Sequence, residues 1–145
     1  MLRRIDIDGT QEVCFDEGRS RNGTLLLLHG FPDVPTTFDA LADELVARGY
    51  RVLRPYLPGY APSSYPGPFD VASLCTRLLR VLDPLCDEPC HLIGHDWGAV
   101  LGYALLRRAP ERFLSGTCLS VPHPLHLLRR AHKEPAQLGR SAYML

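Results

Sequence analysis

The chain has 145 residues, of which 46% are hydrophobic and 22% charged, and its 16 basic and 16 acidic side chains give a formal net charge of zero. This composition is typical of a folded globular domain and excludes a disordered chain. The balanced charge argues against a protein that binds nucleic acid or an anionic membrane surface. The longest aliphatic run, Leu25 to Leu28, is far shorter than the roughly 20 residues that a membrane-spanning helix needs.

The first residues contain no apolar segment of a secretory signal, which favours a cytoplasmic protein. The five cysteines are widely spaced and form no C-x-x-C motif, so they are expected to be buried thiols in a reducing compartment. The alternative is a zinc site made of Cys86, Cys90, His91 and His95. It is the weaker interpretation, because Cys90 and His91 are adjacent on a predicted strand and would point to opposite faces. We expect neither a metal nor a cofactor.

Strand and helix patterns alternate along the chain. Residues 3–17 predict an antiparallel hairpin around Asp8-Gly9, and the aliphatic run 24–28 predicts a strand buried on both faces. The remaining elements are expected, in chain order, as a helix over 36–48, a strand over 51–57, a loop over 58–68, a helix from 71 to about 85, a strand over 90–94, a helix over 97–108 and a strand over 113–121. Strands that alternate with helices predict crossover connections and a parallel sheet, hence an α/β protein.

The first two helices carry signals for their ends. Thr36 or Thr37 is expected to cap the first helix and Gly49 to end it, and Asp70 is expected to cap the second. The expected buried stripes are Phe38, Leu41, Leu45 and Val46 in the first helix and Val71, Leu74, Leu78, Leu82 and Leu85 in the second.

The strongest local motif is Gly94-His95-Asp96-Trp97-Gly98, which has the form G-x-nucleophile-x-G between a predicted strand and a predicted helix. Such a turn is so sharp that a side chain at either flanking glycine would clash, and it lifts the central side chain to the top of the sheet. Here that side chain is Asp96. A carboxylate is ionised at neutral pH and attacks an electrophilic carbon without a general base, forming an alkyl ester. The start of the following helix should help to keep Asp96 ionised.

A second motif, His29-Gly30-Phe31-Pro32-Asp33, follows the end of another predicted core strand. In open α/β sheets such strand ends line the ligand crevice. The turn is expected to present the backbone N–H of Phe31 inward, while Pro32 removes a competing donor. Together with the N–H of Trp97, this N–H would form an oxyanion hole for hydrolysis of the ester.

These motifs resemble the α/β-hydrolase-fold epoxide hydrolases. They occur in the same order as in that family, together with the loop Gly59-Tyr60-Ala61-Pro62-Ser63-Ser64 and the segment Val121-Pro122-His123-Pro124. The resemblance implies an α/β-hydrolase fold and a small uncharged epoxide as substrate. It also implies that Asp96 is the alkylating nucleophile, that Phe31 and Trp97 supply the oxyanion N–H groups, and that no cofactor is needed. The expected substrate pocket includes His29, Gly30, Pro32 and His95.

The haloalkane dehalogenases are the sister group and share much of this pattern. Many of them place a catalytic acid just after the strand that is expected to end here at Val121, and this sequence has no carboxylate there, which favours an epoxide hydrolase. Epoxide hydrolases carry a tyrosine near the start of their cap, the lid segment over the core. The segment Ser141-Ala142-Tyr143-Met144-Leu145 resembles that region, so Tyr143 is expected to donate a hydrogen bond to the opening epoxide oxygen, unless it is simply a packed aromatic residue. The indole of Trp97 is alternatively a halide contact.

The family order continues with a catalytic acid and a histidine well beyond the cap, and the sequence contains neither. We therefore expect residues 1–122 to form the N-terminal half of the hydrolase core and 123–145 an incomplete start of the cap. The expected strand 113–121 would then be an open sheet edge, which favours pairing with another chain, including a second copy. A third interpretation follows, in which the chain is a non-catalytic hydrolase remnant that acts as an interaction module.

Overall fold

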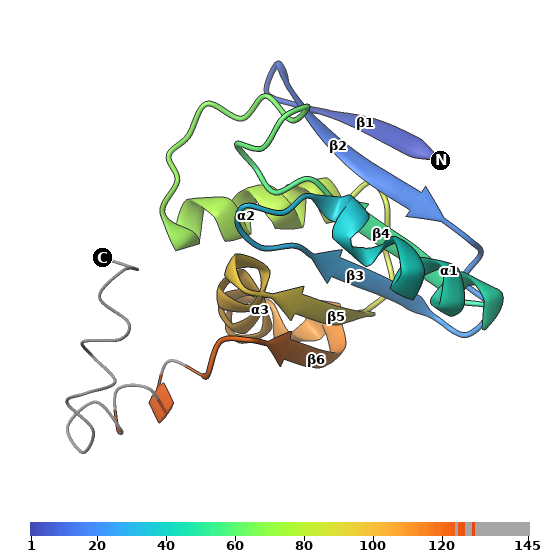
Figure 1. Ribbon diagram of the computed structural model, residues 1–145. Coiled ribbons are helices and arrows are strands. Elements are labelled where there is room, and N and C mark those ends of the chain that lie inside the picture. The colour runs from blue at the N-terminus through green and yellow to red at the C-terminus, as the bar shows by residue number, and fades with distance from the viewer. Residues whose placement is uncertain (124, 127–128, 130–145) are drawn as a thin grey trace.

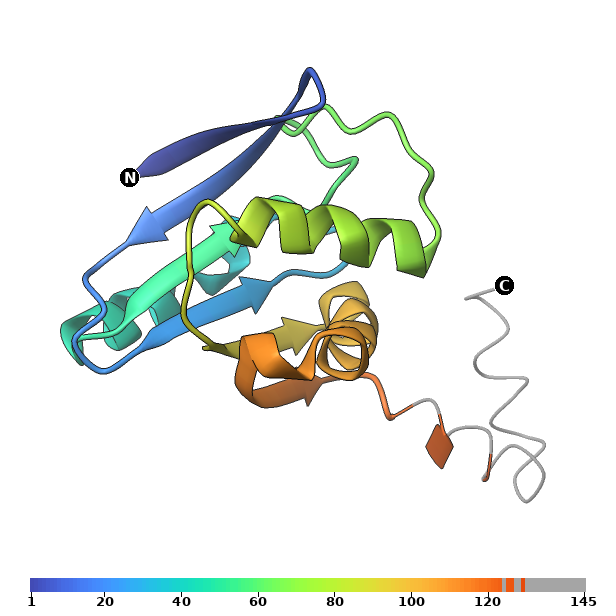
Figure 2. The same cartoon turned by 180° about the vertical axis from the view of Figure 1, so that it is seen from behind.

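The computed structural model describes residues 1–123, 125–126 and 129. A six-stranded sheet forms the centre of the molecule, with α1 on one face and α2 and α3 on the other (Figures 1 and 2). The strand order across the sheet is β1-β2-β4-β3-β5-β6. The elements are β1 (Leu2–Ile7), β2 (Thr10–Glu17), β3 (Thr24–Leu28), a 3₁₀ turn (Pro35–Phe38), α1 (Asp39–Ala47), β4 (Arg51–Pro55), α2 (Val71–Leu82), β5 (Cys90–His95), α3 (Trp97–Arg108), a 3₁₀ turn (Pro110–Arg112) and β6 (Phe113–Leu119).

The predicted hairpin is confirmed. Strands β1 and β2 pair antiparallel with Ile7 opposite Thr10. Asp8 and Gly9 connect the two strands and both have positive φ angles, 55° and 76°. Positive φ at both positions of a two-residue loop matches the right-handed twist of the flanking strands, and Asp-Gly is a favoured pair for it.

The predicted α/β class and its parallel sheet are also confirmed. Strand β3 lies between β4 and β5, and all of these pairings, together with β5 to β6, are parallel. All five residues of β3 are buried, as expected for a strand covered on both faces. Each parallel connection runs through a helix, so the carboxyl ends of β3 and β5 lie side by side at one edge of the sheet.

The helix expected over 36–48 is wrong at its start. Residues 35–38 form a 3₁₀ turn, and neither Thr36 nor Thr37 caps α1 with its side chain. Pro35 at the first position of this turn favours the tighter start. Of the expected stripe, Phe38 is buried and Leu45 and Val46 pack against the core, whereas Leu41 is 37% exposed and Ala42 is buried instead. The expected end is correct, because Gly49 follows the helix with a φ of 84°.

Helix α2 begins as predicted. The carboxylate of Asp70 accepts a hydrogen bond from the backbone N–H of Ser73 at 3.0 Å. Leu78 and Leu82 are buried as expected, whereas Val71 is 36% exposed. The sequence analysis did not anticipate that Arg77 would be buried on the same face of the helix.

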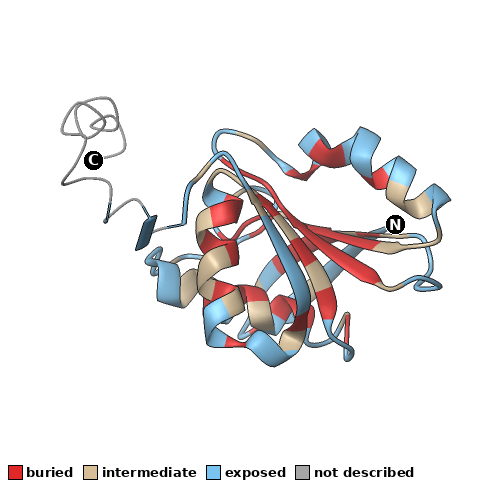
Figure 3. Ribbon diagram, turned by 90° about the horizontal axis from the view of Figure 1, so that it is seen from below, coloured by how far each residue is buried: buried red, intermediate tan, exposed pale blue. Residues whose placement is uncertain are grey.

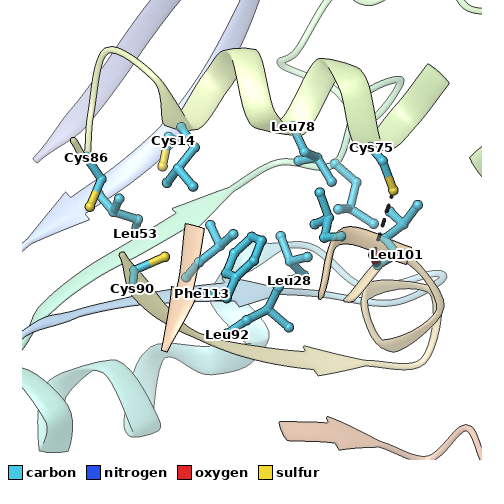
Figure 4. Packing of buried hydrophobic residues seen from close by; sticks show 14 residues of the cluster. Cys14, Leu28, Leu53, Cys75, Leu78, Cys86, Cys90, Leu92, Leu101 and Phe113 are labelled. Carbon is cyan, nitrogen blue, oxygen red and sulfur yellow. Dashed lines mark hydrogen bonds between the residues drawn. The ribbon is translucent and has the colours of Figure 1, made fainter. Parts of the chain in front are cut away.

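Buried side chains form one cluster on each side of the sheet (Figure 3). The smaller cluster lies under α1. The larger lies under α2 and α3 and includes four of the five cysteines, all of which are free thiols (Figure 4). Burial raises the pKa of Cys14 and Cys90 to about 12, so these thiols stay protonated at neutral pH.

Strand β6 lies at the edge of the sheet. Within the described residues it pairs only with β5, and its Leu114 and Leu119 are 62% and 45% exposed. A hollow of about 470 Å³ on the α1 side of the sheet extends over this region, lined by His91, Ile93, Ser115 and Thr117 among others. The strand ends at Leu119, two residues before the expected Val121.

The predicted division at residue 122 falls where the described chain nearly ends, and most of the segment 123–145 lies outside the described residues. Among the helices that the structure describes, none combines the length and the apolar character required to cross a membrane.

Candidate active site

Asp96 occupies the turn between the end of β5 and the start of α3. Its φ of 54° and ψ of −119° are unusual for a residue with a side chain. A backbone in such a region costs on the order of 1–3 kcal/mol and persists only where the surrounding structure imposes it. The Asp96 carbonyl accepts hydrogen bonds from the N–H groups of Ala99 and Val100, which ties the turn to the first turn of α3.

The glycines on both sides of Asp96 allow this turn to close. A Cβ atom on Gly94 would lie 2.3 Å from the carbonyl oxygen of Gly98, and one on Gly98 would lie 2.0 Å from the carbonyl oxygen of Leu28. Both contacts are with backbone, which cannot move aside as a flexible side chain can. Close packing of β5, α3 and β3 thus requires glycine at both positions.

The segment after β3 packs directly against Asp96. A Cβ atom on Gly30 would lie 2.5 Å from Cβ of Asp96. The next residue, Phe31, donates its backbone N–H to Oδ1 of Asp96 at 2.9 Å. Among the described residues no hydrogen bond to Oδ2 is found, so this donor distinguishes the two carboxylate oxygens. Pro32 follows and contributes no N–H.

His29 lies beneath this segment and is completely buried. Its Nε2 accepts the backbone N–H of Leu57 at 3.0 Å, and its Nδ1 lies 2.9 Å from the carbonyl oxygen of Gly30, to which it donates. These two contacts define the neutral form with the proton on Nδ1. Burial lowers the pKa of His29, although the Gly30 carbonyl opposes this shift. His29 joins the end of β3 to the chain after β4 and supports the site from below.

His95 precedes Asp96 and faces Asp33, from the segment after β3. The His95 Nδ1 and an Asp33 carboxylate oxygen are 4.0 Å apart, and this nitrogen is buried without a hydrogen-bond partner. The sequence analysis assigned His95 to the pocket but gave Asp33 no role. The two residues are 62 positions apart, and only the parallel pairing of β3 with β5 brings them together.

The loop 56–69 forms the other side of the site. The Tyr60 ring packs edge-on against His29, with ring centroids 4.9 Å apart. Burial raises the pKa of Tyr60, and the charges of Asp96 and Asp33 raise it further, so its hydroxyl remains a proton donor at neutral pH. Tyr60 is part of the motif 59–64, but nothing in a loop pattern shows where its side chain will lie.

An apolar pocket of about 170 Å³ includes Trp97, the residue after Asp96, in its lining. Its walls come from the loop 56–69 and from helices α2 and α3, and Trp97 contributes its half-exposed indole. The lining residues are Leu57, Pro58, Tyr60, Phe69, Leu74, Trp97 and Leu101.

Two predictions about other residues have different outcomes. Tyr143 lies outside the described residues. Cys90, one member of the alternative zinc set, is buried under α2 and α3, whereas the adjacent His91 contacts Ser115 at 2.8 Å and lines the hollow on the opposite face. In the described part of the chain no group of three or more His, Cys, Asp or Glu side chains is arranged to hold a metal ion.

Comparison with known proteins identifies the family of the chain. Residues 23–138 match the model of the alpha/beta hydrolase fold family. Epoxide hydrolase A of Mycobacterium tuberculosis is 31% identical to the chain over 144 residues, which cover 97% of the chain and 44% of that protein. Epoxide hydrolase 4 of Mus musculus is 32% identical over 143 residues, covering 97% of the chain and 40% of that protein.

A crystal structure of an epoxide hydrolase from Vigna radiata superimposes with a TM-score of 0.79 at 27% identity, over 92% of this chain and 46% of that one. The chain thus spans less than half the length of the relatives it matches. The match to the family model and the likeness to named relatives lead to one conclusion: the chain belongs to the alpha/beta hydrolase fold family and within it is similar to the epoxide hydrolases.

Proposed function

We propose that Asp96 opens epoxides by forming an alkyl ester with the protein. The observation that carries this proposal is the way the Asp96 carboxylate is held at the top of the strained turn. Oδ1 is held by the Phe31 N–H at 2.9 Å, and Oδ2 is left for attack. A nucleophile held in this way loses little freedom when it reacts, which lowers the barrier.

The bond changes in this step balance without a cofactor. Oδ2 forms a bond to one ring carbon, the bond from that carbon to the ring oxygen breaks, and the ring oxygen takes one proton. Tyr143 stays our candidate for the donor of that proton. The product is a hydroxyalkyl ester of Asp96, and the mass of the protein increases by the mass of the epoxide.

Hydrolysis of this ester would place negative charge on the oxygen that the Phe31 N–H already contacts. The N–H of Trp97, the first residue of α3, belongs to the helix start, where N–H groups have no partner within the helix. Together these two groups would stabilise the oxyanion. His29, Gly30, Pro32 and His95 complete the surroundings of Asp96 in this proposal.

We expect the 145-residue chain to stop at the ester. Hydrolysis needs a base that deprotonates water, and the resemblance to the family places that histidine beyond the cap. Of the two described histidines nearest to Asp96, His29 is not available as this base, and the Nδ1 of His95 is buried. Both nitrogens of His29 are hydrogen-bonded, and Nδ1 of His95 is turned to Asp33.

Intact-mass spectrometry after exposure to an epoxide tests both statements. The expected result is one added epoxide mass in the unaltered chain, located at Asp96 by peptide mapping, and no adduct in the Asp96→Asn variant. No adduct at Asp96 would overturn the nucleophile assignment. Steady release of diol that Asp96→Asn abolishes would contradict the expected stop at the ester.

A second candidate is a haloalkane dehalogenase-like reaction, which the half-exposed indole of Trp97 beside the nucleophile favours as a halide contact. The same alkyl ester would form, with halide as the leaving group. Incubation with a haloalkane and measurement of released halide distinguishes the two, since an epoxide-specific site releases none.

A further inference from the structure

We propose that the apolar pocket beside Asp96 binds a phenyl or compact branched group of the substrate, so that the site selects aryl and branched epoxides over small linear ones. This inference rests on the proposed function and adds a substrate class to it. We argue it from the construction of the pocket, its position and its size.

The outer wall of the pocket is the ring of Phe69, which is fixed although it is 59% exposed. A Cβ atom on Gly59 would lie 2.5 Å from this ring, and one on Gly67 would lie 3.1 Å from it. The ring therefore packs directly against the backbone at Gly59 and at Gly67, where a side chain would clash with it. Tyr65 packs edge-on against it, with ring centroids 5.7 Å apart. An exposed aromatic ring held in this way presents a face to a ligand at little cost in conformational entropy.

The loop that carries this wall is anchored to the sheet. The Ser63 hydroxyl accepts the backbone N–H of Val13 at 3.1 Å, and the Ser64 hydroxyl accepts the backbone N–H of Gln11 at 2.8 Å. The Ser64 backbone also donates to the Gln11 carbonyl. These bonds attach the loop to β2, so the pocket is formed before any ligand binds.

Two of the lining residues, Trp97 and Tyr60, connect the pocket to the surroundings of Asp96. Trp97 follows Asp96 directly, and Leu101 lies one helical turn further along α3 on the same side. Tyr60 approaches from the loop, and its ring packs edge-on against His29, whose Nδ1 donates to the carbonyl of Gly30 next to Asp96. A group attached to an epoxide carbon that Asp96 attacks can therefore reach the pocket.

The size and lining of the pocket select its occupant. Its volume is about 170 Å³, and an apolar cavity of roughly 150 Å³ binds benzene. All seven lining residues are aliphatic, aromatic or proline, and none is charged. A charged or strongly polar substituent would lose its hydration here without gaining a partner.

The test compares alkylation of Asp96 by styrene oxide and by propylene oxide, followed by intact mass. Leu74→Phe fills the pocket from α2, whereas Leu114→Phe, on the exposed edge strand, is the matched control. The ratio of the two rate constants is expected to fall by about tenfold or more in Leu74→Phe and to stay unchanged in the control, because one misplaced group in an apolar pocket changes discrimination by about this much. The inference would be overturned if the ratio of the rate constants for styrene oxide and propylene oxide were the same in wild type and in Leu74→Phe.

A binding measurement separates this inference from the proposed function. Trp97 is the only tryptophan of the chain and lines the pocket, so its fluorescence reports occupancy directly. Benzyl alcohol is expected to change this fluorescence saturably in wild type and in Leu114→Phe, and far more weakly in Phe69→Ala. Saturable binding of benzyl alcohol without alkylation by either epoxide would refute the proposal that Asp96 is the nucleophile, and it would support the proposal that the pocket binds an aryl group. A linear, unsaturable response in wild type would refute the pocket, whatever the alkylation result.

Discussion

At the scale of single residues, the pair formed by Glu12 on β2 and Arg77 on α2 is the most deeply buried charge contact. The two side chains are 1% and 5% exposed, and their nearest atoms are 2.7 Å apart. Arg77 also donates to the carbonyl of Ile7, so it ties α2 to the hairpin. Removing one partner leaves the other charge buried without compensation, which costs far more than the pair itself contributes.

We predict that Glu12→Ala lowers the free energy of unfolding by about 3–5 kcal/mol. Urea unfolding followed by circular dichroism measures this loss. Glu44→Ala is the control, because Glu44 pairs with Arg48 on the exposed face of α1 and should cost no more than about 0.5 kcal/mol. Equal losses in the two variants would show that burial does not determine the cost.

Protonation of His29 makes stability depend on pH. Burial lowers its pKa in the folded state below the value of about 6.5 in the unfolded chain. Between these two values the unfolded chain binds more protons, so the free energy of unfolding falls as pH is lowered below about 6.5. Unfolding in urea between pH 7.5 and 5.5 should show this fall. It should be absent in His29→Gln and retained in His126→Gln, whose side chain is exposed. If the free energy of unfolding still falls with pH in His29→Gln, the pH dependence belongs to another group.

At the scale of elements, the turn between β5 and α3 depends on backbone contacts that only glycine permits. We predict that Gly98→Ala destabilises the chain by about 1–3 kcal/mol or more, since its Cβ would lie 2.0 Å from the carbonyl oxygen of Leu28. Gly9→Ala in the hairpin is the control. Gly9 has a positive φ, which Gly98 does not, but a Cβ atom on Gly9 would have nothing within 4 Å, so the substitution should cost only the roughly 1 kcal/mol of that backbone conformation. Thermal unfolding compares the two. A smaller loss in Gly98→Ala than in Gly9→Ala would mean that the turn can relax.

Elements with strong local signals were predictable. The Asp8-Gly9 turn, the aliphatic strand β3 and the Asp70 cap all act within a few residues, so a local pattern determines them. The start of α1 was not, because Pro35 begins a 3₁₀ turn there and neither threonine caps the helix. The stripe itself was mostly correct, since Phe38 is buried and Leu45 and Val46 pack against the core, whereas Ala42 is buried in place of Leu41. Packing against β3 and β4 decides how deeply a residue at the border of the stripe lies, and the helical pattern alone does not record it.

At the scale of the whole molecule, β6 is one of the two edge strands of the sheet and pairs only with β5 within the described residues. Strand β6 exposes Leu114 beside the hollow over β5 and β6. Long apolar edges offer unpaired backbone groups to another chain. We predict that the 145-residue chain associates with itself through β6 as its concentration rises, as measured by light scattering coupled to size-exclusion chromatography.

Leu114→Lys should shift this equilibrium towards the monomer, because a charge on the edge strand opposes pairing. Leu41→Lys places the same charge on α1, away from the edge, and should leave association unchanged. A chain that remains monomeric at high concentration would contradict the edge-pairing prediction and remove the basis for an interaction module.

The sequence by itself determined the α/β class, the order of most elements and the position of Asp96 in a glycine-flanked turn, because these depend on local periodicity and on steric limits of single residues. Only the tertiary structure decided that Phe31 holds Oδ1 of Asp96, that His95 faces Asp33, and that the ring of Phe69 closes a pocket beside them. These contacts join residues that are far apart in the sequence. Phe31 and Asp96 are 65 positions apart, Asp33 and His95 are 62 apart, and Phe69 and Trp97 are 28 apart. The pairing of β3 with β5 brings such segments together, and no local pattern in the chain records which strands will be neighbours.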